Sequence, residues 1–166
     1  SYHWHIEYEI IRILKGEFLM TIGEEEFLAR AGDIIFVKGG LLHGGIPVKC
    51  MYECIVFNLG ALMTSSPAGD RLLKKICDDS IQDLNHFPKP DPELMRITER
   101  MFGQMKTQAE GHELIVIGAF YEFFGYVLER RHYIITQDIS TKEGRRIEHL
   151  KRALEVIENS YPDCIT

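Results

Sequence analysis

The chain has 166 residues, of which 45% are hydrophobic, so it is long enough to form one domain of ordinary size around a core. Its formal net charge of -6 argues against this segment binding a nucleic-acid backbone by itself, because such binding depends on neutralising phosphates. No apolar run approaches the length of a membrane span. The cysteines have no framework spacing, which predicts reduced thiols and a cytoplasmic protein: Cys50, Cys54, Cys77 and Cys164.

Residues 1–60 are predicted to be β-structure. Short runs rich in Ile, Val, Phe and Tyr are separated by expected turns at Lys15-Gly16-Glu17, Ile22-Gly23-Glu24 and Ala31-Gly32-Asp33. Regular short strands with tight turns favour a barrel or jelly roll. The predicted strands are Glu7–Leu14, Glu17–Ile22, Glu26–Arg30, Asp33–Lys38 and Met51–Asn58.

Three histidines and one carboxylate within this stretch form a candidate metal and ligand site: His3, His5, Glu9 and His43. Residues two apart on an extended strand share a face, so His3, His5 and Glu9 are expected to point the same way, with His43 arriving from another strand. Imidazole nitrogen and carboxylate oxygen suit Zn, Ni, Fe(II), Mn or Cu, and the pattern does not choose among them. The alternative is that the same groups line a polar pocket and hydrogen-bond an organic effector without a metal.

The last predicted strand leaves its orientation open. Tyr52, Cys54 and Val56 share one face and Glu53 and Ile55 the other, and the pattern does not say which face lines a cavity. Tyr52 is kept as a candidate ligand-binding residue, with packing on the surface or in the core as the alternative.

Residues 61–133 change to helical spacing, with predicted helices over Ala68–Ser80, Pro92–Ala109 and His112–Arg131. Asp91 is expected to cap the second helix, and Pro92 suits its first position. The third helix is too apolar to stand alone in water, so it should cover the open side of the barrel, a twofold partner, or both. Its glycines at 118 and 125 favour packing within one subunit over a dimer contact.

The C-terminal residues divide into two parts. Residues 134–146 are polar and are predicted to be a linker. Helical spacing returns in residues 147–166, through Ile147, Leu150, Leu154 and Ile157, and Thr166 could cap a following helix. The chain is therefore expected to be a fragment of a longer protein.

Two motifs in the N-terminal half resemble those of cupins. His3-x-His5-xxx-Glu9-xxxxxx-Gly16 is similar to the first cupin motif, and Gly32-xxxxx-Lys38-x-Gly40-xx-His43 is similar to the second. Lys38 stands where the second motif usually has proline, and Pro47 replaces its final asparagine. The resemblance implies a mainly β fold with added α-structure, in which a cupin-type double-stranded β-helix (jelly-roll) barrel is followed by a helical segment.

The whole chain also resembles AraC-type transcription regulators. The barrel is similar to their effector domain in His3-Trp4-His5 and Ala31-Gly32-Asp33-Ile34, and residues 147–166 are similar to the first helix of their helix-turn-helix DNA-binding domain. This resemblance implies a cupin effector-binding barrel (1–60), a dimerising helical segment (61–133), a linker (134–146) and a truncated DNA-binding domain (147–166). It also implies a small-molecule effector such as a sugar, a homodimer, and DNA as a partner of the full-length protein.

Two functional classes follow from these features. The first is a non-enzymatic sensing domain, in which an effector in the barrel changes DNA binding by favouring one of two states. The alternative is a metal-dependent cupin enzyme, such as a dioxygenase or isomerase, with His3, His5, Glu9 and His43 holding the ion. The predicted linker and C-terminal helix favour the sensor, because an isolated enzyme does not need them.

Overall fold

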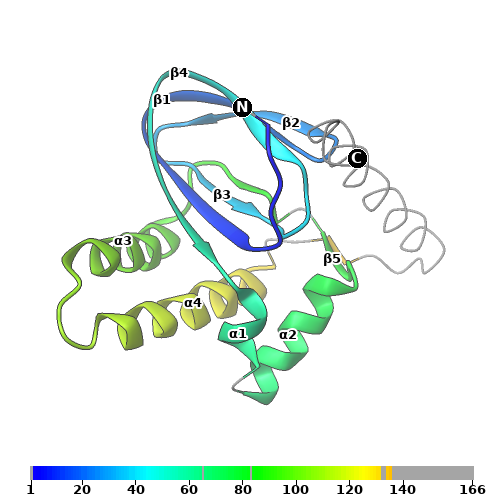
Figure 1. Ribbon diagram of the computed structural model, residues 1–166, viewed down its shortest axis with the longest axis vertical. Coiled ribbons are helices and arrows are strands. Elements are labelled where there is room, and N and C mark those ends of the chain that lie inside the picture. Colours follow the sequence, from blue (N-terminus) through cyan, green and yellow to red (C-terminus); the bar gives the residue numbers. More distant parts are fainter. Residues whose placement is uncertain (1, 65, 83, 132–133, 136–166) are drawn as a thin grey trace, which may run out of the picture.

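A computed structural model describes residues 2–64, 66–82, 84–131 and 134–135. A curled antiparallel sheet forms one side of the molecule, and the helices gather on the other (Figure 1). The first half contains β1 (Tyr8–Ile22), β2 (Glu25–Arg30), β3 (Ile34–Val37) and β4 (His43–Phe57). The second half contains α1 (Leu59–Met63), α2 (Pro67–Cys77), β5 (Ile81–Gln82), β6 (His86–Phe87), α3 (Pro92–Thr107), α4 (His112–Glu129) and β7 (Ile134–Ile135).

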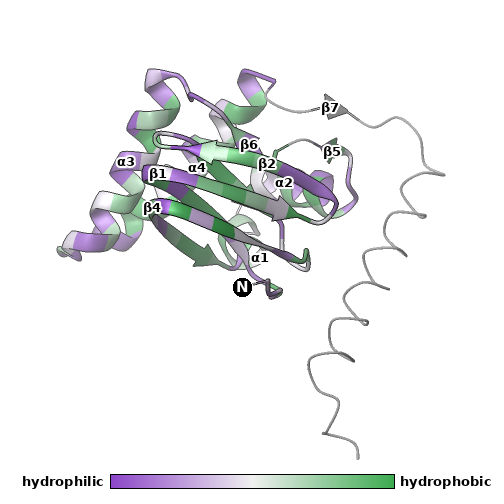
Figure 2. Ribbon diagram, turned by 90° about the horizontal axis from the view of Figure 1, so that it is seen from above, coloured by the Kyte–Doolittle hydropathy of each residue, from purple (hydrophilic) through white to green (hydrophobic). Residues whose placement is uncertain are grey.

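The sheet is organised around β1. One edge of β1 pairs first with β3 and then with β2, while the other edge pairs with β4 from Tyr8↔Phe57 to Ile22↔His43. Strands β2, β1 and β4 lie side by side in Figure 2. The result is a curled antiparallel half-barrel followed by helices, which confirms the predicted fold class.

Two of the expected strand boundaries are wrong. Lys15-Gly16-Glu17 is not a turn: β1 continues through it, with register shifts at Ile13/Lys15 and Lys15/Glu17. Strand β4 begins at His43 rather than Met51. The other two predicted turns are confirmed, with Gly23 and Gly32 at φ +59° and +95°.

The two faces of the sheet carry separate hydrophobic clusters, because successive strand residues point to opposite sides. Ile10, Phe36 and Phe57 pack toward the helices, where their partners include Phe120 and Phe124. The inner face of the curl is filled by Ile11, Ile13, Phe18, Met20, Ile22, Ala29, Ile35 and Val37. Complete burial of one such large side chain contributes about 1.5–3 kcal/mol.

The three predicted helices correspond to α2, α3 and α4, with ends that differ by a few residues. Helix α1 was not predicted. Helix α4 packs on the sheet face opposite to Ile11 and Ile13, so the expectation that it covers the open side of the barrel is wrong. The expectation that its glycines pack within the subunit is not met by the described residues, among which a Cβ on Gly118 or Gly125 would meet nothing within 4 Å. Residues 136–166, with most of the predicted linker and the DNA-binding helix, lie outside the described residues.

The segment after α2 adds to the sheet. Strand β6 pairs with β3, and β5 pairs with β7, so residues 61–133 are not purely helical as predicted. Among the described helices, none is long and apolar enough to cross a membrane.

Candidate metal and ligand site

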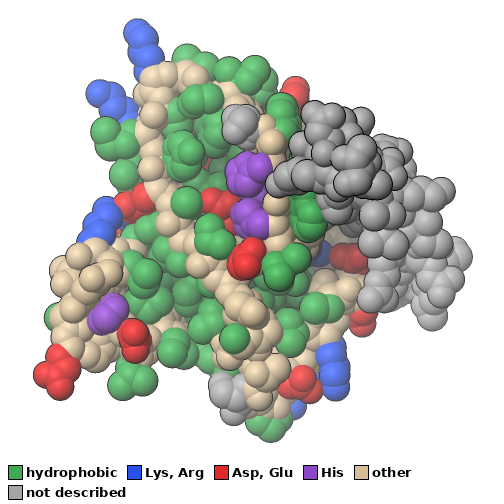
Figure 3. Space-filling model, viewed as in Figure 1, with side chains coloured by type: hydrophobic (Ala, Val, Ile, Leu, Met, Phe, Trp, Pro, Cys, Tyr) green, Lys and Arg blue, Asp and Glu red, His purple; other side chains and the backbone are tan. Residues whose placement is uncertain are grey.

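The structure brings together the four residues that the sequence pattern singled out. His3 and His5 come from the N-terminal segment, Glu9 from β1, and His43 from the first position of β4. One candidate ligand atom from each residue lies within 4.8 Å of all the others. Histidine side chains gather near the middle of the face in Figure 3, beside acidic side chains and surrounded by apolar ones.

The backbone arrangement that brings the four side chains together differs from the expected one. Residues 3–7 are not part of β1, and a bend at residues 6 and 7 precedes it. Instead, the His3 amide donates to the His43 carbonyl (2.9 Å), and the His43 amide donates to the His3 carbonyl (3.0 Å). The Gly40 amide donates to the His5 carbonyl (2.8 Å). The N-terminal segment therefore lies against the segment leading into β4, and the argument from strand parity is wrong although the four side chains do meet.

Backbone carbonyls determine which ring nitrogen of His5 and of His43 carries the proton. Nδ1 of His5 lies 3.0 Å from the Glu7 carbonyl, and Nδ1 of His43 lies 2.8 Å from the Leu41 carbonyl. A carbonyl only accepts hydrogen bonds, so each Nδ1 carries the proton and, in the neutral ring, each Nε2 keeps its lone pair. Such a hydrogen bond on the far nitrogen is typical of histidines that bind metals.

Both Nε2 atoms lie near the carboxylate of Glu9. The distance to Oε2 is 3.3 Å from His43 and 3.7 Å from His5. Glu9 and His43 are only 7% and 2% exposed, and Nε2 of His43 has no partner with hydrogen-bond geometry among the described residues. A buried polar atom without a hydrogen bond is costly, so it marks a place for a ligand.

Glu9 and His43 each stabilise the charged form of the other. Burial alone would raise the pKa of Glu9, but contacts with His43 and Cys54 lower it below its usual value. Burial alone would lower the pKa of His43, but its contacts with Glu9 and the Leu41 carbonyl raise it. The carboxylate is therefore ionised at neutral pH, as a metal ligand must be. The cluster of His3, His5, Glu9 and His43 could hold a divalent metal.

Cys54 joins the site although the sequence did not mark it. Burial together with the neighbouring carboxylate of Glu9 raises the pKa of the Cys54 thiol to about 12. Cys54 lies opposite Ile11 in the register of β1 and β4, which places its face of β4 on the inner side of the curl. The shared face of Tyr52, Cys54 and Val56 was visible in the sequence, but the register with Glu9 was not.

Tyr52 lies on the same inner side, opposite Ile13. Its ring stacks on Phe18 with 5.3 Å between centroids, and the residue is 47% exposed. The packing expected as its alternative role is therefore present, and a role in ligand binding stays a prediction.

Comparison with known proteins places the chain in a family. Residues 1–124 match the family model of the AraC-like ligand binding domain. A further match is an uncharacterised HTH-type transcriptional regulator, YdeC, of Bacillus subtilis (strain 168), which is 38% identical over 56 residues. That match covers 32% of this chain and only 19% of the length of the Bacillus protein. Because the family model covers most of the chain and includes the whole curled sheet, the chain belongs to the family of AraC-like ligand-binding domains.

Proposed function

We propose that this domain senses a small molecule for a DNA-binding transcription regulator, and that a divalent metal at His3, His5, Glu9 and His43 forms part of its binding site. The observation that carries the proposal is the convergence of four ligand atoms within 4.8 Å beside the inner face of the sheet in a domain of this family. The name of the Bacillus protein supports the regulatory role.

Each residue of the site has its own proposed role in binding. The Nε2 atoms of His5 and His43 and a carboxylate oxygen of Glu9 would hold the metal, and His3 would complete the protein ligands. A divalent ion here would act as a Lewis acid that attracts an oxygen atom of the effector. Tyr52, half-exposed on the same side of the sheet, is the proposed aromatic contact of the effector.

Metal analysis of purified protein tests the site. We expect the wild type to retain about one equivalent of a divalent metal, and Glu9→Gln and His43→Ala to lose most of it, because both remove a buried ligand. His112→Ala is the matched control, since this histidine at the start of α4 instead contacts the Ala109 carbonyl. Equal metal in all four proteins, or none in the wild type, would contradict the proposed site.

We further propose that two copies of the chain associate through α4. The helix exposes Leu114 (75%) and Ile117 (39%), and Gly118 and Gly125 leave open space where side chains would otherwise stand. Small residues beside exposed apolar ones allow a second helix to approach closely, and soluble oligomers are most often twofold dimers. A second copy of this chain is therefore the proposed partner of this face.

A further inference from the structure

The loop between β3 and β4, residues 38–42, contacts two of the proposed metal ligands. The Gly40 amide donates to the His5 carbonyl at 2.8 Å, and the Leu41 carbonyl lies 2.8 Å from Nδ1 of His43. One short loop therefore holds the backbone of one ligand and the ring of another. Where these two imidazoles lie depends on how this loop is held.

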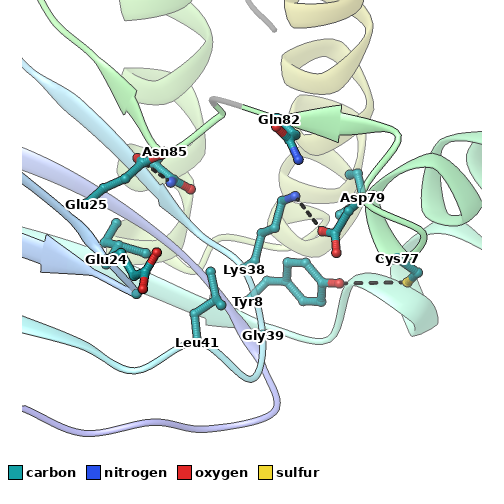
Figure 4. A pocket seen from close by; sticks show the side chains of 13 residues that line it. Tyr8, Glu24, Glu25, Lys38, Gly39, Leu41, Cys77, Asp79, Gln82 and Asn85 are labelled. Carbon is teal, nitrogen blue, oxygen red and sulfur yellow. Dashed lines mark hydrogen bonds and ion pairs between the residues drawn. The ribbon is translucent and has the colours of Figure 1, made fainter. Parts of the chain in front are cut away.

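Lys38, the first residue of the same loop, reaches the segment after α2. Its Nζ donates to Oδ1 of Asp79 (3.3 Å) and to the Ile81 carbonyl of β5 (3.0 Å), and Figure 4 draws the contact with Asp79. The side chains of Lys38 and Asp79 are only 14% and 21% exposed. Lys38 is therefore not a solvated turn residue. Proline, the usual residue at this position of the second cupin motif, has no side-chain donor and could not make these contacts.

The backbone after α2 fixes the carboxylate that Lys38 contacts. Asp79 has a φ of +55°, a left-handed conformation that aspartate adopts more readily than most residues. Its amide donates to the Ile76 carbonyl at 3.3 Å, which ties this turn to the last residues of the helix. The partner of Lys38 thus has a fixed position at the end of α2.

Polar contacts, rather than packing, join the loop to β5 at this point. A cavity of about 640 Å³ is lined by residues of the loop on one side and by the end of α2 and Gln82 on the other (Figure 4). Lys38 crosses this space. The hydroxyl of Tyr8 also faces Sγ of Cys77, but at 3.9 Å and with a thiol as a weak partner.

Strand β5 pairs with the strand at the start of the predicted linker. Ile81 lies opposite Ile135 and Gln82 opposite Ile134, so the pairing of β5 with β7 is two residues long. Such a short pair of strands is only marginally stable by itself. The contact of Lys38 with the Ile81 carbonyl therefore bears directly on whether this pairing persists.

We propose that Lys38 couples metal binding at the histidine cluster to the pairing of β5 with β7. A metal that fixes His5 and His43 would also fix the loop that contacts both, and the ordered loop would then hold Lys38 against β5 at a smaller entropy cost. Lys38 is a positioning residue, because it is not one of the four ligands. This inference rests on the metal site proposed above, and its test observes β5 as well as the metal.

Amide hydrogen exchange of the 166-residue chain with and without saturating Zn²⁺ tests the coupling. In the wild type, we expect Zn²⁺ to slow exchange in the segment that contains β5 about fivefold. Lys38→Met should still take up Zn²⁺, because all four ligands remain, but its exchange at β5 should be fast with or without the metal. His43→Ala, which loses a ligand, should exchange in Zn²⁺ like the metal-free wild type.

Binding of the metal gives a second measurement. Coupling between two equilibria is reciprocal, so Lys38→Met should weaken Zn²⁺ binding by the same factor of about five, although no ligand is changed. Lys74→Met is the matched control, because it removes the same charge from an exposed pair with Asp70 on α2. It should keep both the affinity for Zn²⁺ and the response at β5.

Asp79→Asn is a second test of the contact. Asparagine also tolerates a left-handed backbone, so this variant removes the charge that Lys38 contacts without straining the turn. It should reduce the response of β5 to Zn²⁺, and it keeps the test decisive if Lys38→Met does not fold. Melting temperatures show which variants are folded.

Two results in a wild type that binds Zn²⁺ would overturn the inference. These are unchanged exchange at β5 when the metal binds, and an equal response of the wild type and Lys38→Met. Equal loss of the response in Lys38→Met and Lys74→Met would indicate a general effect of charge and would overturn it too. A wild type that takes up no Zn²⁺ would instead contradict the metal site itself and the coupling with it, so the two failures are distinguishable.

Discussion

Glu53 on β4 joins the sheet to the helices. Its carboxylate accepts a hydrogen bond from Nε of Arg12 on β1 at 2.9 Å and pairs with Nζ of Lys106 on α3. The Arg12 guanidinium also lies 5.3 Å from the ring centroid of Phe102. Burial alone would raise the pKa of Glu53, but the contacts with Lys106 and Arg12 lower it below its usual value.

Replacing Glu53 should destabilise the fold in a pH-dependent way. We expect Glu53→Gln to lower the free energy of unfolding at pH 7 by about 2 kcal/mol, because Arg12 loses a charged partner at a site only 14% exposed. Since the folded pKa is lowered, this contribution is complete above the ordinary glutamate value of about 4.3 and is lost as pH falls through the folded value. Urea unfolding of both proteins at pH 7 and pH 3 should give a smaller difference in acid.

The exposed pair of Glu17 with Arg30 provides the comparison. Their atoms are 3.2 Å apart, but both side chains are largely in solvent, so Glu17→Gln should cost about 1 kcal/mol or less. If the two variants lose the same stability, the contacts of Glu53 add nothing beyond an ordinary surface pair.

Among single residues, the sequence identified the ligand types but not what orients them. His3, His5, Glu9 and His43 could be found because metal ligands are few in kind and their spacing is regular. The carbonyls of Glu7 and Leu41 hold two of the imidazoles, and every residue carries a carbonyl, so no residue type marks this role.

Among the elements, the helices were easier to predict than the strands. Asp91 caps α3 as expected, with its side chain accepting from the amides of Glu93 and Leu94. A helix cap depends only on residues close to it in the sequence, so it can be predicted from a short stretch of sequence.

In β1 the residues around Gly16 were mistaken for a turn, and the first part of β4 was not predicted. A Cβ on Gly45 would lie 2.0 Å from the Leu19 carbonyl oxygen, so this glycine allows β1 and β4 to approach each other. Gly16, at φ +76°, occupies the irregularity in β1 and would place a Cβ 2.2 Å from the Lys49 carbonyl oxygen. Both requirements come from a distant strand and are invisible in a local pattern.

The exposed apolar face of helix α4 leads to a prediction about the oligomeric state. We expect the wild type to be a dimer in sedimentation analysis and Ile117→Glu to shift it to monomer, since the change places a charge in the proposed apolar contact. Val48→Glu on β4 is the matched control, because it adds the same charge at another exposed β-branched residue (52% exposed) and should remain dimeric.

A monomeric wild type would contradict the dimer, and equal dissociation of Ile117→Glu and Val48→Glu would move the contact away from α4. The melting temperature of each variant separates loss of association from loss of folding.

At the scale of the whole molecule, the order of sheet and helices followed from the change of hydrophobic period near residue 60. The face on which the helices pack did not follow, because both faces of the sheet are apolar and either could have received α4. Membership of the AraC-like ligand-binding domains adds a prediction about the full-length protein.

The proposed regulatory role predicts that a DNA-binding module of the full-length protein carries two helix-turn-helix units that enter the major groove. The sequence of the full-length protein checks this, and a full-length protein without such units would contradict the proposed role. Binding of the full-length protein to its own promoter region, measured with and without Glu9→Gln, would then connect the metal site to DNA binding.

The pairing of β1 with β4 has a consequence for how the chain is made. Partners such as Tyr8 and Phe57 are far apart in the sequence, and this high contact order places folding in the slower range, about milliseconds to seconds. During synthesis β1 leaves the ribosome before β4 and keeps one unpaired edge until β4 arrives. An open strand edge readily recruits strands from other chains, so aggregation during expression should be greatest for variants that delay β4, with Gly45→Val as the clearest case.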